Sequence, residues 1–149
     1  MKGILSIFTV TLFASCLGAQ EKKPWEIDRL CGKLEHVQKI SDRKNANTFS
    51  EKRKALREVP LGLYERHENQ ACCEGVSAVE TTQTGRGGQF EFKTKKPGNF
   101  WMATNWRGKK YKLAVVNKPE KNSATMCSQQ GIALDDEGNA DWWLTVTVD

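Results

Sequence analysis

Residues 79–116 constrain the fold more than any other stretch, because apolar and polar side chains alternate there between glycine-containing turns. Phe90 and Phe92 alternate with charged residues directly after the glycine-rich segment 84–88, and the alternation resumes after the Pro-Gly turn at residues 97–98. A period of two is the repeat of a strand that has one face against a core, and glycine and proline mark the turns between strands. The stretch therefore predicts consecutive β-hairpins.

Further strands are expected on both sides of this region. Apolar residues recur in residues 30–37, 56–64 and 111–115, and in a last strand. The expected inner faces carry Val59, Leu61 and Leu63 in the second of these segments, Tyr111, Leu113 and Val115 in the third, and Trp142, Leu144, Val146 and Val148 in the last strand. Residues 38–53 and 118–137 contain little apolar sequence, so we expect long surface loops there. Residues 30–149 are thus predicted to form an all-β domain, a single seven-stranded antiparallel Greek-key sandwich, within the 149-residue chain.

The N-terminal residues 1–19 have the pattern of a signal peptide, with an early lysine, a short apolar run and small residues before the expected cleavage site. Residues 20–29 are polar and are expected to form a tether. The apolar run is too short for a transmembrane span. A secreted or periplasmic location is therefore expected. The segment 12–16 also resembles a bacterial lipobox, so lipid anchoring through Cys16 is the alternative.

Cysteine number indicates disulfides in the exported protein. Either route of processing leaves Cys31, Cys72, Cys73 and Cys127, and an even number of cysteines in an oxidising compartment predicts two disulfides. A bridge between neighbours in sequence would strain the peptide, so we expect Cys72 and Cys73 to pair separately with Cys31 and Cys127. The sequence leaves open which of them pairs with which.

Positive charge is concentrated in one segment. The chain carries a formal net charge of +5, and residues 39–54 contain six basic residues (Lys39, Arg43, Lys44, Lys52, Arg53, Lys54) against the acidic Asp42 and Glu51. Such a cluster could attract anionic glycans, phospholipid headgroups or nucleic acid. Acidic residues are interspersed and no aromatic platform for bases accompanies it, which favours a solvated loop and no nucleic-acid partner.

The sequence contains none of the motifs that we associate with common catalytic sites. Gly-x-Ser-x-Gly, His-Glu-x-x-His and phosphate-binding glycine loops do not occur in it. We therefore expect that the protein is not an enzyme and binds no cofactor. Asp135, Glu137, Asn139 and Asp141 place oxygen atoms at every second position, which could gather calcium. Gly138 does not fit the glycine position of an EF-hand loop, however, and a plain turn before the last strand is favoured over a metal site.

The order of these features resembles the carboxypeptidase regulatory-like domain of the transthyretin-like (prealbumin-like) sandwich group. The resemblance covers residues 31–116 and rests on Gly32-Lys33-Leu34, Val59-Pro60-Leu61-Gly62-Leu63, the threonine-rich strand with its glycine turn at residues 81–92, and Pro97-Gly98-Asn99-Phe100-Trp101-Met102. The basic segment and the four cysteines depart from the family pattern. The resemblance implies a non-catalytic module, of the kind that accompanies peptidases or outer-membrane receptors.

Three tryptophans are the candidate binding residues. Strand alternation directs Trp101 and Trp143 outward, opposite the inward Phe100 and Trp142, and Trp106 lies in a turn. We expect a module that binds a protein or cell-envelope partner through its loops and outer sheet face, with a carbohydrate-binding, starch-binding-like module as the alternative. A flat, open Trp101 would favour glycan binding. The contrary expectation is that residues 39–54 or 118–137 fold over the outward tryptophans.

Overall fold

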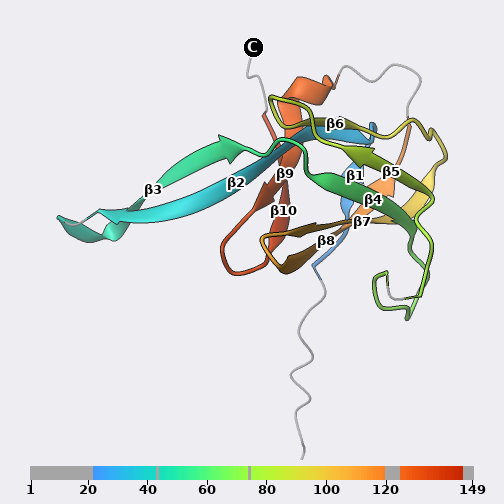
Figure 1. Cartoon of the computed structure of the whole chain (residues 1–149), viewed down its shortest axis with the longest axis horizontal. Coiled ribbons are helices and arrows are strands. Elements are labelled where there is room, and N and C mark those ends of the chain that lie inside the picture. The colour runs from blue at the N-terminus through green and yellow to red at the C-terminus, as the bar shows by residue number, and fades with distance from the viewer. Residues whose placement is uncertain (1–21, 43, 74, 120–124, 146–149) are drawn as a thin grey trace, which may run out of the picture.

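A computed structural model describes residues 22–42, 44–73, 75–119 and 125–145. Ten strands lie in these described ranges (Figure 1). They are β1 (Trp25–Ile27), β2 (Cys31–Asp42), β3 (Asn45–Ala55), β4 (Pro60–Glu65), β5 (Glu80–Gln83), β6 (Gln89–Glu91), β7 (Gly98–Trp106), β8 (Lys109–Asn117), β9 (Gln130–Leu134) and β10 (Ala140–Leu144), with a 3-10 helix, η1 (Cys127–Gln129). Within the described part of the chain, no helix has the length and apolar character needed to cross a membrane.

The strands form two sheets. The first sheet has the order β1-β8-β7-β4-β5, and the second has the order β10-β9-β2-β3, with β6 also paired to β2. Two pairings, β1 with β8 and β2 with β9, are parallel. The all-β class is confirmed, but the described residues form ten strands where seven were expected. The other pairings are antiparallel, as expected. Of the hairpins expected in residues 79–116, only β7–β8 forms, because β5 pairs with β4 in the first sheet and β6 pairs with β2 in the second. The three additional strands are β1, β3 and β9. β1 and β9 pair with strands that are distant in sequence, and the side chains of β3 are mainly polar.

The two sheets enclose one hydrophobic core. Leu63, Met102 and Leu113 face each other across β4, β7 and β8, and each of them is buried. Leu34, Ile132 and Trp142 form the corresponding row of the second sheet. The predicted inner faces of β4, β7 and β8 are confirmed by this packing.

The end of the last strand departs from the predicted pattern. Leu144, expected to face inward, is 52% exposed. The expected inward positions Val146 and Val148 lie outside the described residues. Trp142 is therefore the one confirmed member of that predicted inner face.

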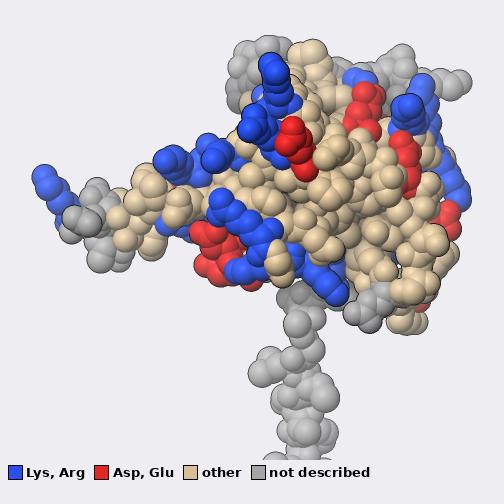
Figure 2. Space-filling view, in the orientation of Figure 1, with Lys and Arg blue, Asp and Glu red and all other residues tan. Residues whose placement is uncertain are grey.

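The basic segment is not a loop, as expected, but a two-stranded arm. Residues 38–54 of β2 and β3, here called the arm, extend away from the sandwich (Figure 1). Lysine and arginine side chains are distributed along it (Figure 2). Its strands pair with Lys39 opposite Glu51 and Gln38 opposite Lys52, and the register shifts between Ser41 and Asp42 near the tip. A backbone ladder can continue without apolar side chains, and opposite charges across it stabilise the pair, which is why hydrophobic periodicity did not reveal it.

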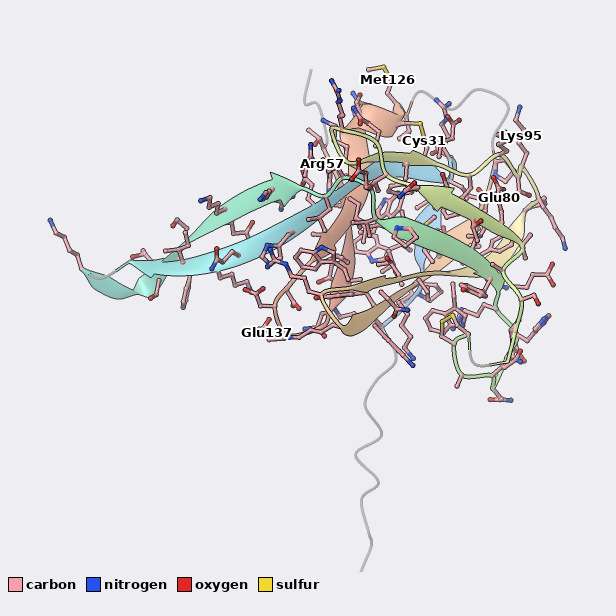
Figure 3. The ribbon with its side chains drawn as sticks, in the orientation of Figure 1. Cys31, Arg57, Glu80, Lys95, Met126 and Glu137 are labelled. Carbon is pink, nitrogen blue, oxygen red and sulfur yellow. A yellow bond between two sulfur atoms is a disulfide. The ribbon has the colours of Figure 1, made fainter. Side chains whose placement is uncertain are left out.

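Two disulfides lie within the described residues, but their pairing differs from the expected one. Cys31 pairs with Cys127, and Cys72 pairs with its neighbour Cys73. Cys31 lies beside η1 (Figure 3), where Gln130 Nε2 donates hydrogen bonds to the carbonyl oxygens of Cys31 and Arg29. The approach of η1 to β2 brings Cys127 to Cys31 and leaves the adjacent cysteines to each other. Disulfides are compatible with an extracytoplasmic location.

Part of the expected N-terminal tether is a strand of the sandwich. Residues 1–19 and Cys16 lie outside the described residues. The expected tether of residues 20–29 includes β1, which pairs with β8 and buries Ile27 in the core. This short segment therefore belongs to the sandwich, because a single buried side chain and one parallel ladder attach it.

Candidate binding site on the outer face of the first sheet

A hollow of 550 Å³ lies over strands β4, β7 and β8, on the face of the first sheet that points away from the core. Tyr64, Ala103 and Lys112 line it. In the sheet register Gly62 pairs with Ala103, which pairs with Lys112. The ring of Tyr64 lies over Gly62, since a Cβ atom at position 62 would come within 2.6 Å of Tyr64 Cε2. Because Gly62 and Ala103 have little or no side chain, the Tyr64 ring can pack directly on the sheet backbone.

The loop of residues 66–79 borders the hollow with the Cys72–Cys73 disulfide. Both ends of this loop are attached to the sheet. The backbone N–H of Arg66 donates to the carbonyl oxygen of Asn99 (3.0 Å), and that of Val79 donates to the carbonyl oxygen of Leu63 (2.7 Å). The disulfide thus forms an apolar border held next to the sheet by its loop.

Cationic side chains supply the polar side of the hollow. Lys110 and Lys112 project outward from β8, and among the described residues no carboxylate lies within ion-pair distance of either. The hollow also reaches Gly138 in the β9–β10 turn. An anionic group entering here would meet two ammonium groups that have no ionic partner in the described structure.

Trp101 points outward from β7, as predicted, but its ring is not an open shelf. The side chain is half-buried, and the Arg66 guanidinium and the Lys112 ammonium each lie 5.2 Å from the ring centroid. Cations over an indole face are attracted by its quadrupole and occupy the surface that a sugar ring would use. This cover comes from β8 and from loop 66–79. It does not come from the described part of residues 39–54, and residues 120–124 of the other expected segment lie outside the described residues.

The other two candidate tryptophans lie elsewhere. Trp143 lies on the outer face of the second sheet, across Gly131, with the Arg53 guanidinium 6.0 Å from its ring centroid. Its Nε1 atom is buried and has no hydrogen-bond partner among the described residues. The expectation that the basic segment covers Trp143 is thus met by one side chain, Arg53.

Trp106 packs at one end of the sandwich. Its ring lies 4.8 Å from that of His36 and 6.4 Å from that of Tyr111, with the Arg107 guanidinium 4.5 Å from the indole centroid. Because Trp101, Trp106 and Trp143 face three different sides, they do not form one binding surface.

The β9–β10 turn resembles the plain turn that the sequence favoured. Asp135 Oδ1 accepts hydrogen bonds from the backbone N–H groups of Glu137 (3.0 Å) and Asn139 (2.8 Å). The Tyr111 hydroxyl donates to the Asp135 carbonyl oxygen (2.9 Å). Burial, together with the charges of Asp135 and Asp136, raises the pKa of Tyr111. The Asp135 carboxylate therefore accepts hydrogen bonds from groups of the turn itself.

Sequence reasoning missed the residues that shape the hollow. Tyr64 and Gly62 were treated as ordinary members of a strand, and the adjacent cysteines were expected to pair elsewhere. One signal was present: a glycine between Leu61 and Leu63, inside a strand pattern, marks a place where another group approaches the backbone closely. Which group approaches could only be known from the folded chain.

Comparison of the chain with models of known protein families, with curated proteins and with solved structures found no match. The resemblance to carboxypeptidase regulatory-like domains therefore rests on sequence motifs alone.

Proposed function

We propose that this protein is an exported, non-catalytic β-sandwich module that binds an acidic polysaccharide of the cell envelope in the hollow on the first sheet. One observation carries the proposal: Lys110 and Lys112, which lack a carboxylate partner among the described residues, line one concave site together with Tyr64. A sugar bearing a carboxylate or sulfate needs both kinds of group.

The size of the hollow supports a small or chain-like ligand. Its volume of 550 Å³ falls within the range of about 300 to 1,000 Å³ that is typical of ligand sites. A protein partner usually covers about 800 Å² of a flatter surface. The concave shape therefore favours a polysaccharide segment over a folded protein domain.

The chemistry of the lining supports an acidic sugar. Tyr64 and the Cys72–Cys73 disulfide offer apolar surface to the C–H face of a sugar ring, and the two lysines offer charge to its acidic group. A neutral, starch-like ligand is less well supported, because Arg66 and Lys112 occupy the faces of Trp101.

We further propose three properties that the sequence suggests. They are cleavage of a signal peptide over residues 1–19, lipid anchoring through Cys16 as the alternative, and kinship with the prealbumin-like Greek-key sandwiches. Support for the kinship comes from the glycine turns of residues 81–92 and 97–98. Intact mass of the exported protein would distinguish a cleaved chain from a lipid-modified one.

The proposed function is tested by titrating the exported protein with polygalacturonate and with amylose, using calorimetry at low salt. We expect binding to polygalacturonate only. Lys110→Ala/Lys112→Ala should weaken it by about tenfold or more, equivalent to about 1.4 kcal/mol or more. The binding should also weaken with added salt, since the site is solvent-exposed.

Lys52→Ala/Lys54→Ala is the matched control, because it removes the same charge from the arm. It should change the affinity by less than about twofold. Equal losses in the two double variants would mean non-specific attraction to a basic protein, and tight amylose binding would favour the neutral-glycan alternative. Either outcome would overturn the proposal.

A further inference from the structure

The Cys72–Cys73 disulfide joins neighbours in sequence, and this sets it apart from the Cys31–Cys127 disulfide. A disulfide restricts the unfolded chain in proportion to the logarithm of the loop it closes. Cys31 and Cys127 are separated by 96 positions, whereas Cys72 and Cys73 are separated by 1. The second bridge therefore contributes almost nothing to the fold by loop closure, and its presence calls for another role.

The surroundings of the two disulfides also differ. Cys31 is 2% exposed and lies in β2. Cys72 and Cys73 are both half-buried and lie in loop 66–79, outside the strands. Cys127, the partner of Cys31, is also half-buried. Thiol–disulfide exchange requires a thiolate to reach a sulfur atom, and both cysteines of the loop disulfide are accessible whereas Cys31 is shielded in the other one, so access favours the loop disulfide.

The backbone at Cys73 is held in an unusual conformation. Its φ of 74° lies in the left-handed region, which residues with a Cβ atom adopt infrequently, and it is larger than the φ of Glu58, Asn69 and Arg107, the other such residues in the described part of the chain. The bond to Cys72 restricts this residue directly. Opening the bond would allow Cys73 to return to an ordinary backbone conformation.

We propose that Cys72–Cys73 is a reversible redox site, opened and closed by exchange with an extracytoplasmic dithiol. A thiolate of the dithiol attacks one sulfur, the Cys72–Cys73 bond breaks, and the other cysteine leaves as a thiolate. The second thiol of the partner then attacks the mixed disulfide, which releases the remaining cysteine and leaves the partner oxidised. Two electrons pass from the dithiol to the cysteine pair, and the reverse sequence restores the bond.

The two lysines on β8 favour this chemistry. Lys110 and Lys112 line the same hollow as the disulfide. Nearby ammonium groups stabilise a cysteine thiolate, which makes it a better leaving group when the bond opens and a better nucleophile when it closes. The same charges that serve the proposed ligand thus serve the exchange.

Opening the bond also changes the hollow. The effect on ligand binding described next rests on the proposed function. The loop ends remain attached through the Arg66 and Val79 backbone hydrogen bonds, so the change is confined to the segment between them. That segment supplies the apolar border, and its rearrangement lowers the affinity for the acidic polysaccharide. The redox state of the pair would therefore regulate binding.

The redox site is tested on the exported protein with dithiothreitol as the probe. Samples equilibrated at rising dithiothreitol concentration are alkylated, and the label on each cysteine is measured by peptide mass spectrometry. We expect Cys72 and Cys73 to be labelled at concentrations about tenfold or more below those that open Cys31–Cys127. Oxidised dithiothreitol should restore the bond.

Cys72→Ser/Cys73→Ser is the matched variant and should take up no label in that concentration range. The proposal is overturned if Cys31 and Cys127 are labelled first or at the same concentration, or if Cys72 and Cys73 remain closed. This measurement does not involve a ligand, so it is independent of the proposed function.

Regulation is tested by polygalacturonate titration of the oxidised protein, the selectively reduced protein and Cys72→Ser/Cys73→Ser. We expect the last two to bind about tenfold more weakly than the oxidised protein. Equal affinities would overturn the regulation. If no form binds, both the proposed function and its regulation fail, whereas the labelling result decides the redox site by itself.

Discussion

At the scale of single residues, the β9–β10 turn depends on one carboxylate. Asp135 accepts hydrogen bonds from the backbone of Glu137 and Asn139 and from Asn139 Nδ2. Burial raises the pKa of this carboxyl, but the hydrogen bonds from Asn139 and Glu137 outweigh that effect and hold its pKa below the ordinary value. The ionised form of Asp135 therefore stabilises the folded state.

Asp135→Ala should lower the free energy of unfolding by about 1 to 3 kcal/mol at pH 7, because hydrogen bonds to a charged acceptor are lost. The folded-state pKa is lowered, so the stabilisation is complete above the ordinary pKa of about 3.9 and is lost as the pH falls through the folded-state pKa. Urea denaturation at pH 7 and below about pH 3 should show the difference between wild type and variant shrinking in acid.

Glu137→Ala is the control for this prediction, since the turn uses the backbone of Glu137 and not its carboxylate. It should have a much smaller effect at both pH values. A difference that is the same at neutral and acid pH would contradict the role assigned to the Asp135 carboxylate.

At the scale of elements, the arm is the part of the sheets least attached to the core. Every one of its side chains that the structure describes is exposed, including Phe49 at 63% and Ile40 at 44%. Arg53 connects it to the sandwich, through the ring of Trp143 and through an ion pair with Glu35 at 3.5 Å. The arm therefore depends on the sandwich more than the sandwich depends on the arm.

Replacing residues 41–49 with Asn-Gly, which would join the facing residues Ile40 and Ser50 by a two-residue turn, should leave the protein folded. We expect a melting temperature within about 5 °C of the wild type, because no described side chain in that segment is buried. Thermal unfolding followed by circular dichroism measures it.

Arg53→Ala serves as the comparison and should cost about 1 kcal/mol or less, through loss of its contacts with Trp143 and Glu35. A loss above about 2 kcal/mol on shortening the arm would place part of the core's stability in the arm.

At the scale of the whole molecule, the Cys31–Cys127 bond joins the start of β2 to η1 and encloses most of the sandwich. By loop closure a bridge of this span stabilises the fold by about 4 to 5 kcal/mol, whereas a bridge between adjacent residues has almost no such effect. The two disulfides should thus be separable by stability measurements as well as by reduction.

Cys31→Ser/Cys127→Ser should lower the free energy of unfolding by about 4 to 5 kcal/mol, and Cys72→Ser/Cys73→Ser by less than about 1 kcal/mol. Guanidinium denaturation of both variants, in buffer without reductant, provides the comparison. Similar losses in the two variants would contradict the assignment of Cys31–Cys127 as the structural bridge.

The sequence by itself determined the β class, the β7–β8 hairpin, the inward faces of β4, β7 and β8, and the outward direction of Trp101. Each of these follows from alternation along one strand or from a local turn, so it can be predicted without knowing which strands are neighbours. The other hairpins expected in residues 79–116 do not form, because β5 pairs with β4 and β6 pairs with β2. Cysteine parity determined that two disulfides form, but not which cysteines pair.

Only the tertiary structure decided which strands and which cysteines pair with each other. β1, β3 and β9 became strands because backbone ladders with β8 and β2 satisfy their hydrogen bonds, which their own side chains do not reveal. Gly131 shows the reason at one position: a Cβ atom there would collide with the Lys33 carbonyl oxygen, so β9 can approach β2 this closely because position 131 has no side chain. The cysteine pairing and the hollow likewise depend on segments that meet across the sequence, and local periodicity carries no information about such meetings.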